Sequence, residues 1–333
     1  MKLSTWFKHR PHRPCLGYYG KLPIYPDFLE HGYGTGVEQM HRRWIEKAVA
    51  RVGCGSGEDV AVASRGWMLR FMVSEPGGAR AAVGLMWDSA DLGGERRFPF
   101  SLHAVLSTDP AKVWWEWLPC QAEWMWDRLD QVRWDLLEAR TPDDVARVCR
   151  QASFSTFPGR DDARRRNSGV LKSLTLGTIR SHLFGDAAMS GWPHLWWRLS
   201  RSFKEDDRPG AVVLPRLPTM NVAAQISFWS GAMAALSGGS LPVPAVFMPV
   251  GSCDRIFFFF RSLTSLDGHV LIQGRPAVLD DGLVLLREEG MDLGNAYQQF
   301  AATLLERQEE TDGALAYWQP GLWNTFHHEE IEK

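Results

Sequence analysis

The sequence predicts an α+β protein in which an antiparallel sheet is flanked by helices. Apolar residues between Trp67 and Val73 alternate with other residues, as in a strand with one buried face. Apolar residues from Val37 to Val52 instead recur at helical spacing. Further strand-like segments follow after residue 210, so we expect an additional α+β region in the C-terminal half.

The elements of the N-terminal half are bounded by residues that favour turns and helix ends. Pro76-Gly77-Gly78 separates the first two strands of a three-stranded meander. Asp109-Pro110 and Thr141-Pro142 each place a capping residue before a proline at the first helical position. The expected elements are a flexible arm at 1–15, a strand from Gly17, a helix at 37–52, strands at 67–73, 81–87 and 98–106, a helix from Asp109 that is interrupted near Pro119, and a helix from Thr141.

A change in composition separates the two halves. Residues 155–170 combine Pro158-Gly159 with a run of charges, and we expect a loop or linker there. This gives an N-terminal domain at 16–155 and a C-terminal α+β region at 170–333 with an extension beyond about residue 266. The C-terminal elements expected are helices near 192–203 and 295–309 and strands near Val212, Ile226, Val246 and Phe257.

The charge balance argues against a nucleic-acid-binding protein. The 333 residues carry a formal net charge of -2, whereas nucleic-acid-binding domains are usually strongly basic. The same balance argues against attachment to a membrane by surface charge. The apolar fraction of 45% is typical of a protein with a buried core.

Three features of the sequence predict a cytoplasmic location. The N-terminus lacks the apolar run of a signal peptide. No stretch approaches the ~20 uninterrupted apolar residues that a transmembrane helix needs, so we expect no membrane insertion. The five cysteines are scattered and odd in number, which suits a reducing compartment.

The sequence contains no recognisable catalytic motif. The phosphate-binding loop, the zinc-protease helix and the nucleophile-elbow patterns are all missing. His327 and His328 are metal-ligand types, but adjacent side chains near a terminus do not easily face one ion. We therefore expect no catalytic residue, no metal and no cofactor. An enzyme whose site is assembled from distant residues would leave no local pattern, so that alternative stays open.

The segment at residues 17–28 reads Gly-Tyr-Tyr-Gly-Lys-Leu-Pro-Ile-Tyr-Pro-Asp-Phe. An aromatic residue precedes Gly-Lys-Leu-Pro, and Asp-Phe follows after three more residues. This opening resembles that of the TagF/ImpM family of type VI secretion system-associated proteins. The positions that match are Tyr19, Gly20, Lys21, Leu22, Pro23, Asp27 and Phe28.

Later elements follow in the order found in the family. Trp44 lies in the predicted helix, and Trp67 with Arg70-Phe71 is similar to a Trp-Arg-Phe strand of the family. Residues 83–102 resemble a segment with Met-Pro-Ser, an aspartate and Arg-x-Phe-Pro-Leu. Its Met-Pro-Ser is replaced here by Met-Trp-Asp-Ser, and the glycine before the arginine is lost, which changes the expected loop shape. Ser227-Phe228-Trp229 is similar to a later strand of the family.

The close resemblance covers about residues 16–107, becomes loose from about 110 to 265, and then ends. It implies a fold like that of longin or profilin domains. It also implies post-translational repression of type VI secretion by binding the forkhead-associated scaffold protein. Two alternatives stay open: a structural or adaptor component of a related contractile secretion machine, and an enzyme with a non-local active site.

The motif residues have a structural and a partner-binding interpretation. Asp27 is expected to accept backbone hydrogen bonds from its own loop, or to pair with Lys21 or with an arginine of the Arg96-Arg97 pair. Phe28 is expected in the core. The loop at residues 91–97 is our candidate for one edge of a partner interface. The family-motif residues that are possible partner-binding residues are Gly20, Lys21, Leu22, Pro23, Asp27, Phe28, Asp91, Arg96, Arg97, Phe98 and Pro99.

The large aromatic residues of the first domain are expected to form one buried cluster. Helical spacing places Trp44 on the inner face of its helix, and period-two alternation places Trp67 and Phe71 on one face of a strand. Phe98 is expected to join them.

Overall fold

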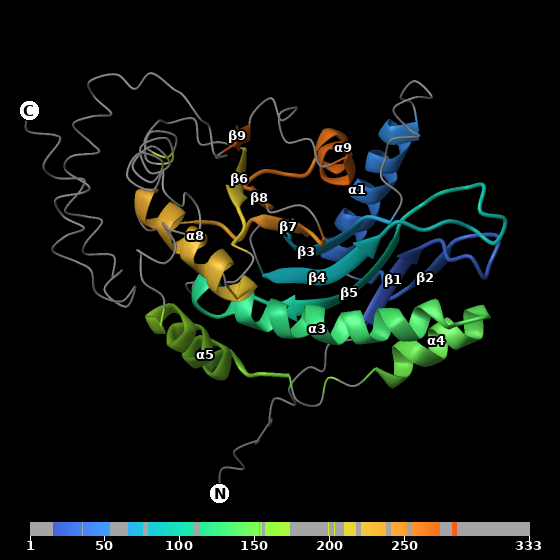
Figure 1. Cartoon of the computed structure of the whole chain (residues 1–333), viewed down its shortest axis with the longest axis horizontal. Coiled ribbons are helices and arrows are strands. Elements are labelled where there is room, and N and C mark those ends of the chain that lie inside the picture. Colours follow the sequence, from blue (N-terminus) through green and yellow to red (C-terminus); the bar gives the residue numbers. More distant parts are fainter. Residues whose placement is uncertain are drawn as a thin grey trace, which may run out of the picture.

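Figure 1 shows a computed structural model of the chain, in which one large sheet lies between two groups of helices. The residues that the structure describes are 16–34, 36–53, 66–75, 79–108, 114–152, 154, 157–173, 199, 203, 210–217, 221–237, 241–251, 255–273 and 282–284.

The sheet has nine strands in the order β2-β1-β5-β4-β3-β7-β8-β6-β9. Neighbouring strands are antiparallel except for β6 and β9, which are parallel. This arrangement confirms the predicted α+β class. The strands are β1 (Leu16–Gly20), β2 (Leu29–His31), β3 (Met68–Ser74), β4 (Arg80–Trp87), β5 (Phe100–Ser107), β6 (Ala211–Pro215), β7 (Ala245–Pro249), β8 (Arg255–Phe259) and β9 (Gly282–Val284).

Strands from both halves of the chain form this one sheet. The link is the antiparallel pair of β3 and β7, whose register runs from Leu69 opposite Pro249 to Met72 opposite Val246. The sheet therefore continues from the region expected at 16–155 into the region expected at 170–333.

Helices cover both faces of the sheet (Figure 1). On one face, α3 packs over the strands and contacts α4, α5 and α8, and on the other face α1 packs with α9. The helices are α1 (Gly36–Gly53), the 3-10 turn η1 (Trp114–Glu116), α3 (Leu118–Leu137), α4 (Pro142–Gln151), α5 (Arg160–Ser173), α8 (Val222–Leu236) and α9 (Ser265–Gln273).

Each face of the sheet has its own apolar core, and tryptophan side chains tie helices to the sheet or to each other. On the α3 face, the indole of Trp126 donates a hydrogen bond to the Phe71 carbonyl at 3.1 Å. On the α1 face, the indole of Trp44 donates to the Thr264 carbonyl, just before α9, at 2.9 Å. Buried indole N–H groups need such acceptors, because an unpaired buried donor is costly.

The expected aromatic cluster is confirmed on the α1 face. Trp44, Phe71 and Phe98 are buried in one core, and Trp67 is partly buried against it. The capping prediction at Thr141 is confirmed as well. Its hydroxyl accepts from the backbone N–H of Asp144, and the Asp144 carboxylate accepts from the Thr141 N–H.

Two predictions about local structure are wrong. The segment at 155–170 is not a loop throughout, because α5 begins at Arg160 and is anchored by the buried amide of Asn167. Ile226 lies in α8 and not in a strand; this helix is apolar on nearly all sides, so periodicity did not reveal it. The interruption expected near Pro119 is confirmed, because η1 ends at Glu116 and α3 begins at Leu118 with Pro119 in its first turn, where no N–H is required.

Several predicted segments lie outside the described residues. They are the arm at 1–15, the start of a helix at Asp109, the helix at 295–309 and the His327-His328 pair; of the helix near 192–203, only Leu199 and Phe203 are described, and both are helical. Within the described part of the chain, every helix is too short or too polar to cross a bilayer.

Candidate functional site

The two segments of the family motif meet at one end of the sheet. Gly20 ends β1 with a φ of +137°, and a Cβ at this position would lie 2.1 Å from the Pro99 carbonyl oxygen. Only glycine accepts both this backbone angle and this close approach. Gly20 therefore lets the loop that follows β1 pass directly over the chain that enters β5.

A buried ion-pair network joins the two segments. The Lys21 ammonium lies 3.5 Å from the Asp91 carboxylate, and both side chains are 5% exposed. The Arg96 guanidinium donates to the same carboxylate at 2.6 Å from its Nε atom. Asp91 is thus shared by two cations from different segments, which fixes their relative position.

The network sets the protonation state of Asp91. Burial alone would raise the pKa of this carboxyl, but hydrogen bonds from Arg96 and the charges of Arg96 and Lys21 outweigh it and lower the pKa below its usual range. Asp91 therefore stays ionised.

Two further hydrogen bonds join the two segments. The Leu92 N–H donates to the Tyr25 carbonyl at 3.1 Å, and Arg96 also donates to the Pro26 carbonyl.

Asp27 takes one of the roles expected for it. Its carboxylate accepts a hydrogen bond from the Phe28 N–H at 2.8 Å, so it binds backbone of its own loop. It does not pair with Lys21, Arg96 or Arg97, because Asp91 binds the first two and Asp88 binds Arg97.

Aromatic rings form the floor of the junction. Phe28 stacks on Tyr19 with ring centroids 5.4 Å apart and meets the edge of Phe98 at 4.8 Å. The Tyr19 hydroxyl donates to Glu46 at 2.8 Å, and burial and this bond raise the pKa of the phenol. Arg42 lies over the Tyr19 ring at 4.5 Å and pairs with Glu46. The rings are thereby fixed against α1.

The exposure of Phe28 corrects the expectation that it belongs to the core. One face of the ring packs on Tyr19 and Phe98, but the side chain is 38% exposed. Tyr25 and Leu92 are exposed as well; neither was predicted as a motif residue, although Leu92 lies in the loop at residues 91–97. A large apolar residue in a polar loop was the available signal. Of the other motif residues, Leu22 and Pro99 are buried and Pro23 is exposed.

Residues 17–149 match the family model described as "TagF N-terminal domain, Type VI secretion system-associated". These residues form a TagF N-terminal domain. The match begins at β1 and ends in α4, and it includes both segments of the motif. The type VI secretion-associated family expected from the sequence is thus confirmed for this part of the chain.

The chain was also compared with curated proteins and with solved structures. No curated protein matches the chain significantly. Among solved structures, the chain is similar to the crystal structure of PA0076 from Pseudomonas aeruginosa PAO1, with 13% sequence identity and a TM-score of 0.40. The alignment covers 84% of this chain and 98% of that one.

The TagF N-terminal domain also contains a buried polar cluster between α1 and the sheet. His103 on β5 lies 3.5 Å from the Glu38 carboxylate, and His41 shares a hydrogen bond of 3.1 Å with Ser101. Both imidazoles are completely buried. Burial, followed by the nearby His103, lowers the pKa of His41 well below its usual value, so His41 is neutral.

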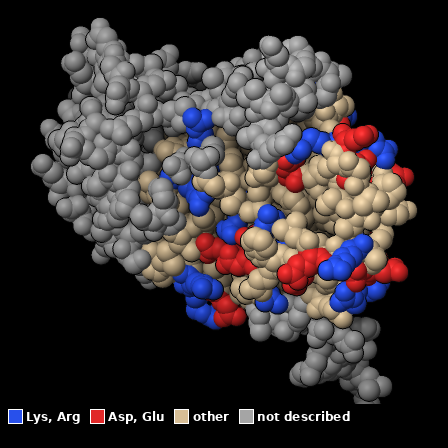
Figure 2. Space-filling model, turned by 45° about the vertical axis from the view of Figure 1, so that its right-hand side comes forward, with Lys and Arg blue, Asp and Glu red and all other residues tan. Residues whose placement is uncertain are grey.

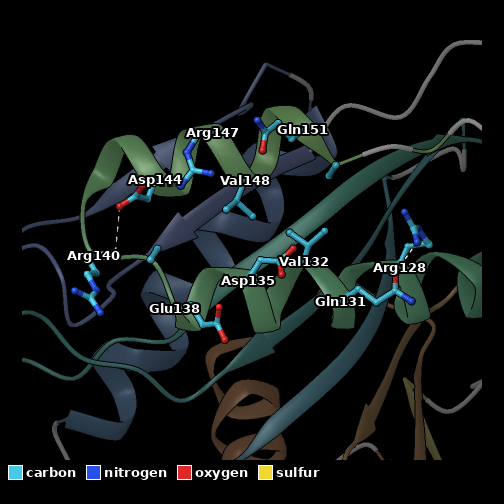
Figure 3. A pocket seen from close by; sticks show the side chains of 12 residues that line it. Arg128, Gln131, Val132, Asp135, Glu138, Arg140, Asp144, Arg147, Val148 and Gln151 are labelled. Carbon is cyan, nitrogen blue, oxygen red and sulfur yellow. Dashed lines mark hydrogen bonds and ion pairs between the residues drawn. The ribbon is translucent and has the colours of Figure 1, made fainter.

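Figure 3 shows a cleft of about 590 Å³ between α3 and α4. Val132 and Val148 line it together with charged side chains of both helices. Two of its charged groups stabilise α4 itself, since Asp144 caps this helix and pairs with Arg147 at 2.6 Å. None of its lining residues belongs to the family motif.

Charged side chains of both signs lie on the part of the surface that Figure 2 colours. On this face, acidic and basic groups lie beside one another in small clusters, and uncharged areas separate the clusters. Within the described residues, no three histidine, cysteine, aspartate or glutamate side chains are grouped so that they could hold a metal ion.

Proposed function

We propose that this chain is an accessory protein of a type VI secretion system that represses secretion after translation by binding the forkhead-associated scaffold protein. Its association with such a system follows from the TagF N-terminal domain at residues 17–149. The observation that carries the finer proposal is that the motif residues of this domain gather at one surface-exposed junction.

The contacts of the motif residues support binding rather than catalysis. Asp91 pairs with both Lys21 and Arg96, and Asp27 binds backbone. These charges build a loop junction instead of facing a cavity where a substrate would react. We propose that the protein acts in the cytoplasm, where the scaffold would be available to it.

A secretion assay in the native host tests the repressor proposal. Deletion of the gene is expected to raise type VI secretion, and overproduction is expected to silence it. Secreted tube protein in the culture medium provides the measurement, normalised to its amount inside the cells. A deletion complemented with the wild-type gene serves as the control.

A pull-down separates this proposal from its alternatives. The tagged chain is expected to recover the forkhead-associated scaffold from a lysate of the native host, and the purified pair should bind directly. Recovery of sheath or baseplate proteins with unchanged secretion would favour the structural or adaptor role. Unchanged secretion with no recovered component of the system would overturn the proposed function.

A further inference from the structure

Three large apolar side chains are exposed on the two segments that meet at the motif junction. Tyr25 is 39% exposed, Phe28 is 38% exposed and Leu92 is 60% exposed. We call these three residues the apolar patch. Large apolar groups exposed together in this way are typical of interaction surfaces, whereas single exposed apolar residues are common everywhere.

The patch is held in a fixed shape from below. The backbone bond from Leu92 to Tyr25 joins its two segments, and the ring of Phe28 rests on Tyr19 and Phe98. Surfaces that are ordered before binding lose little conformational entropy on association. The buried Lys21–Asp91 pair beneath the junction adds to this order.

The charges around the patch are negative in balance. The two segments at residues 21–30 and 88–97 contain three cations and five carboxylates, a formal charge of -2. Every one of these cations is already paired, Lys21 and Arg96 with Asp91 and Arg97 with Asp88. The carboxylates of Asp27 and Glu95 in these two segments have no ion-pair partner among the described residues, and both side chains are exposed.

We propose that Tyr25, Phe28 and Leu92 are the centre of a protein-docking surface, and that the partner presents an apolar side chain flanked by lysine or arginine. The apolar side chain would cover the patch, and the flanking cations would meet Asp27 and Glu95 at its rim. Rim charges of this kind mainly accelerate association, while the apolar centre slows dissociation. The inference rests on the proposed function in taking the forkhead-associated scaffold as this partner.

Binding of the purified full-length chain to the purified scaffold tests the surface. Leu92→Ala is expected to weaken binding about tenfold or more, mainly through faster dissociation. Glu95→Lys is expected to slow association and to flatten its dependence on salt, because an attractive rim charge becomes repulsive. Both side chains are exposed, so neither change should lower the thermal unfolding midpoint appreciably.

Matched controls lie on α3, away from the motif. Leu137 is 47% exposed and Asp135 is an exposed acid, so Leu137→Ala and Asp135→Lys repeat the same chemical changes elsewhere. Both controls are expected to bind like the wild type. If Leu92→Ala and Glu95→Lys also bind like the wild type, the docking surface is wrong while the repressor function stands.

A cross-linking experiment decides the case in which the scaffold does not bind at all. A photoreactive residue at position 92 of the full chain, in the native host, is expected to cross-link to a segment with lysine or arginine beside an apolar residue. The same residue at position 137 provides the background. No specific cross-link at 92, or a cross-link to an acidic segment, would overturn the surface; failure of scaffold binding alone would overturn only the function on which it rests.

Discussion

At the scale of single residues, Gly20 allows the two segments of the family motif to meet at one surface of the protein. Its positive φ and its approach to Pro99 bring the Gly-Lys-Leu-Pro segment against the Arg-Arg-Phe-Pro segment. The sequence predicted both segments as motif residues, and it offered Asp27 as the partner of Lys21. The actual partner is Asp91. Neither segment alone shows that the two loops lie side by side in the fold, so the sequence could not predict this pair.

Replacement of Gly20 by alanine tests this role. We expect a loss of about 3 kcal/mol or more in the free energy of unfolding, since backbone strain adds to a steric clash with backbone of Pro99. Urea denaturation provides the measurement. Gly94→Ala is the matched control, because Gly94 also has a positive φ of 73° but nothing lies within 4 Å of the added methyl group. An equal loss in both variants would contradict the proposed clash.

His41 gives a prediction about pH. Its pKa is depressed in the folded protein and normal, near 6.5, in the unfolded chain. Below pH ~6.5 the unfolded chain therefore binds the extra proton, and the free energy of unfolding falls as the pH falls, by up to ~1.4 kcal/mol per unit. Stability is retained above that pH.

Denaturation curves at pH 7.5, 6.5 and 5.5 measure this effect. The slope of stability against pH should be reduced in His41→Gln, whatever the absolute stability of the variant. His31→Gln changes an exposed histidine and should retain the wild-type slope. A slope that is the same in all three proteins would show that His41 does not titrate on unfolding.

At the scale of elements, prediction from sequence succeeded where apolar residues recur at helical spacing or form short runs between turns. The predicted positions of α1 and of the β3–β4–β5 meander agree with the structure within a few residues, although β4 and β5 are buried on both faces. α8 was missed because Gln225, Ser227 and Ser230 are buried along with its apolar residues, so no amphipathic pattern remains. α5 was missed because its sequence has few apolar residues, and the long-range bonds of Asn167 that anchor it leave no local pattern.

The crossing of α1 and α9 depends on a glycine. A Cβ at Gly268 would lie 2.1 Å from the Cβ of Ala48. Gly268→Ala is expected to destabilise the protein by about 1–3 kcal/mol through overpacking. Ala48→Gly removes the opposing methyl group, so the double variant should recover part of the loss despite the helix cost of glycine, about 1 kcal/mol.

A thermodynamic cycle from thermal or urea unfolding measures this coupling. Additive effects of the two substitutions would mean that the helices do not meet at these positions.

At the scale of the whole molecule, the family domain is not a closed structural unit. β3 is an internal strand only because β7 pairs with it, and Trp44 is covered by the chain around Thr264. The sequence suggested two separate regions, because composition changes near residue 155. Sheet continuation across such a change is a non-local property that no local pattern records.

A fragment of residues 16–152 tests the dependence of the domain on the rest of the chain. It would expose the β3 edge and apolar surface around Trp44 and Phe71, so we expect self-association or insolubility. Light scattering coupled to size-exclusion chromatography, with the full chain in parallel, provides the measurement. A monodisperse fragment that unfolds cooperatively would show that the domain folds alone.

The β3–β7 pair also governs the order of events during synthesis. About 170 residues separate the end of β3 from the start of β7, and at ~5–20 residues per second the ribosome needs about 10–30 s to produce them. During that interval β3 has finished translation but lacks one neighbour. The nascent chain therefore passes through a period in which an apolar strand edge is available to other chains, and holdase chaperones have their opportunity to bind there.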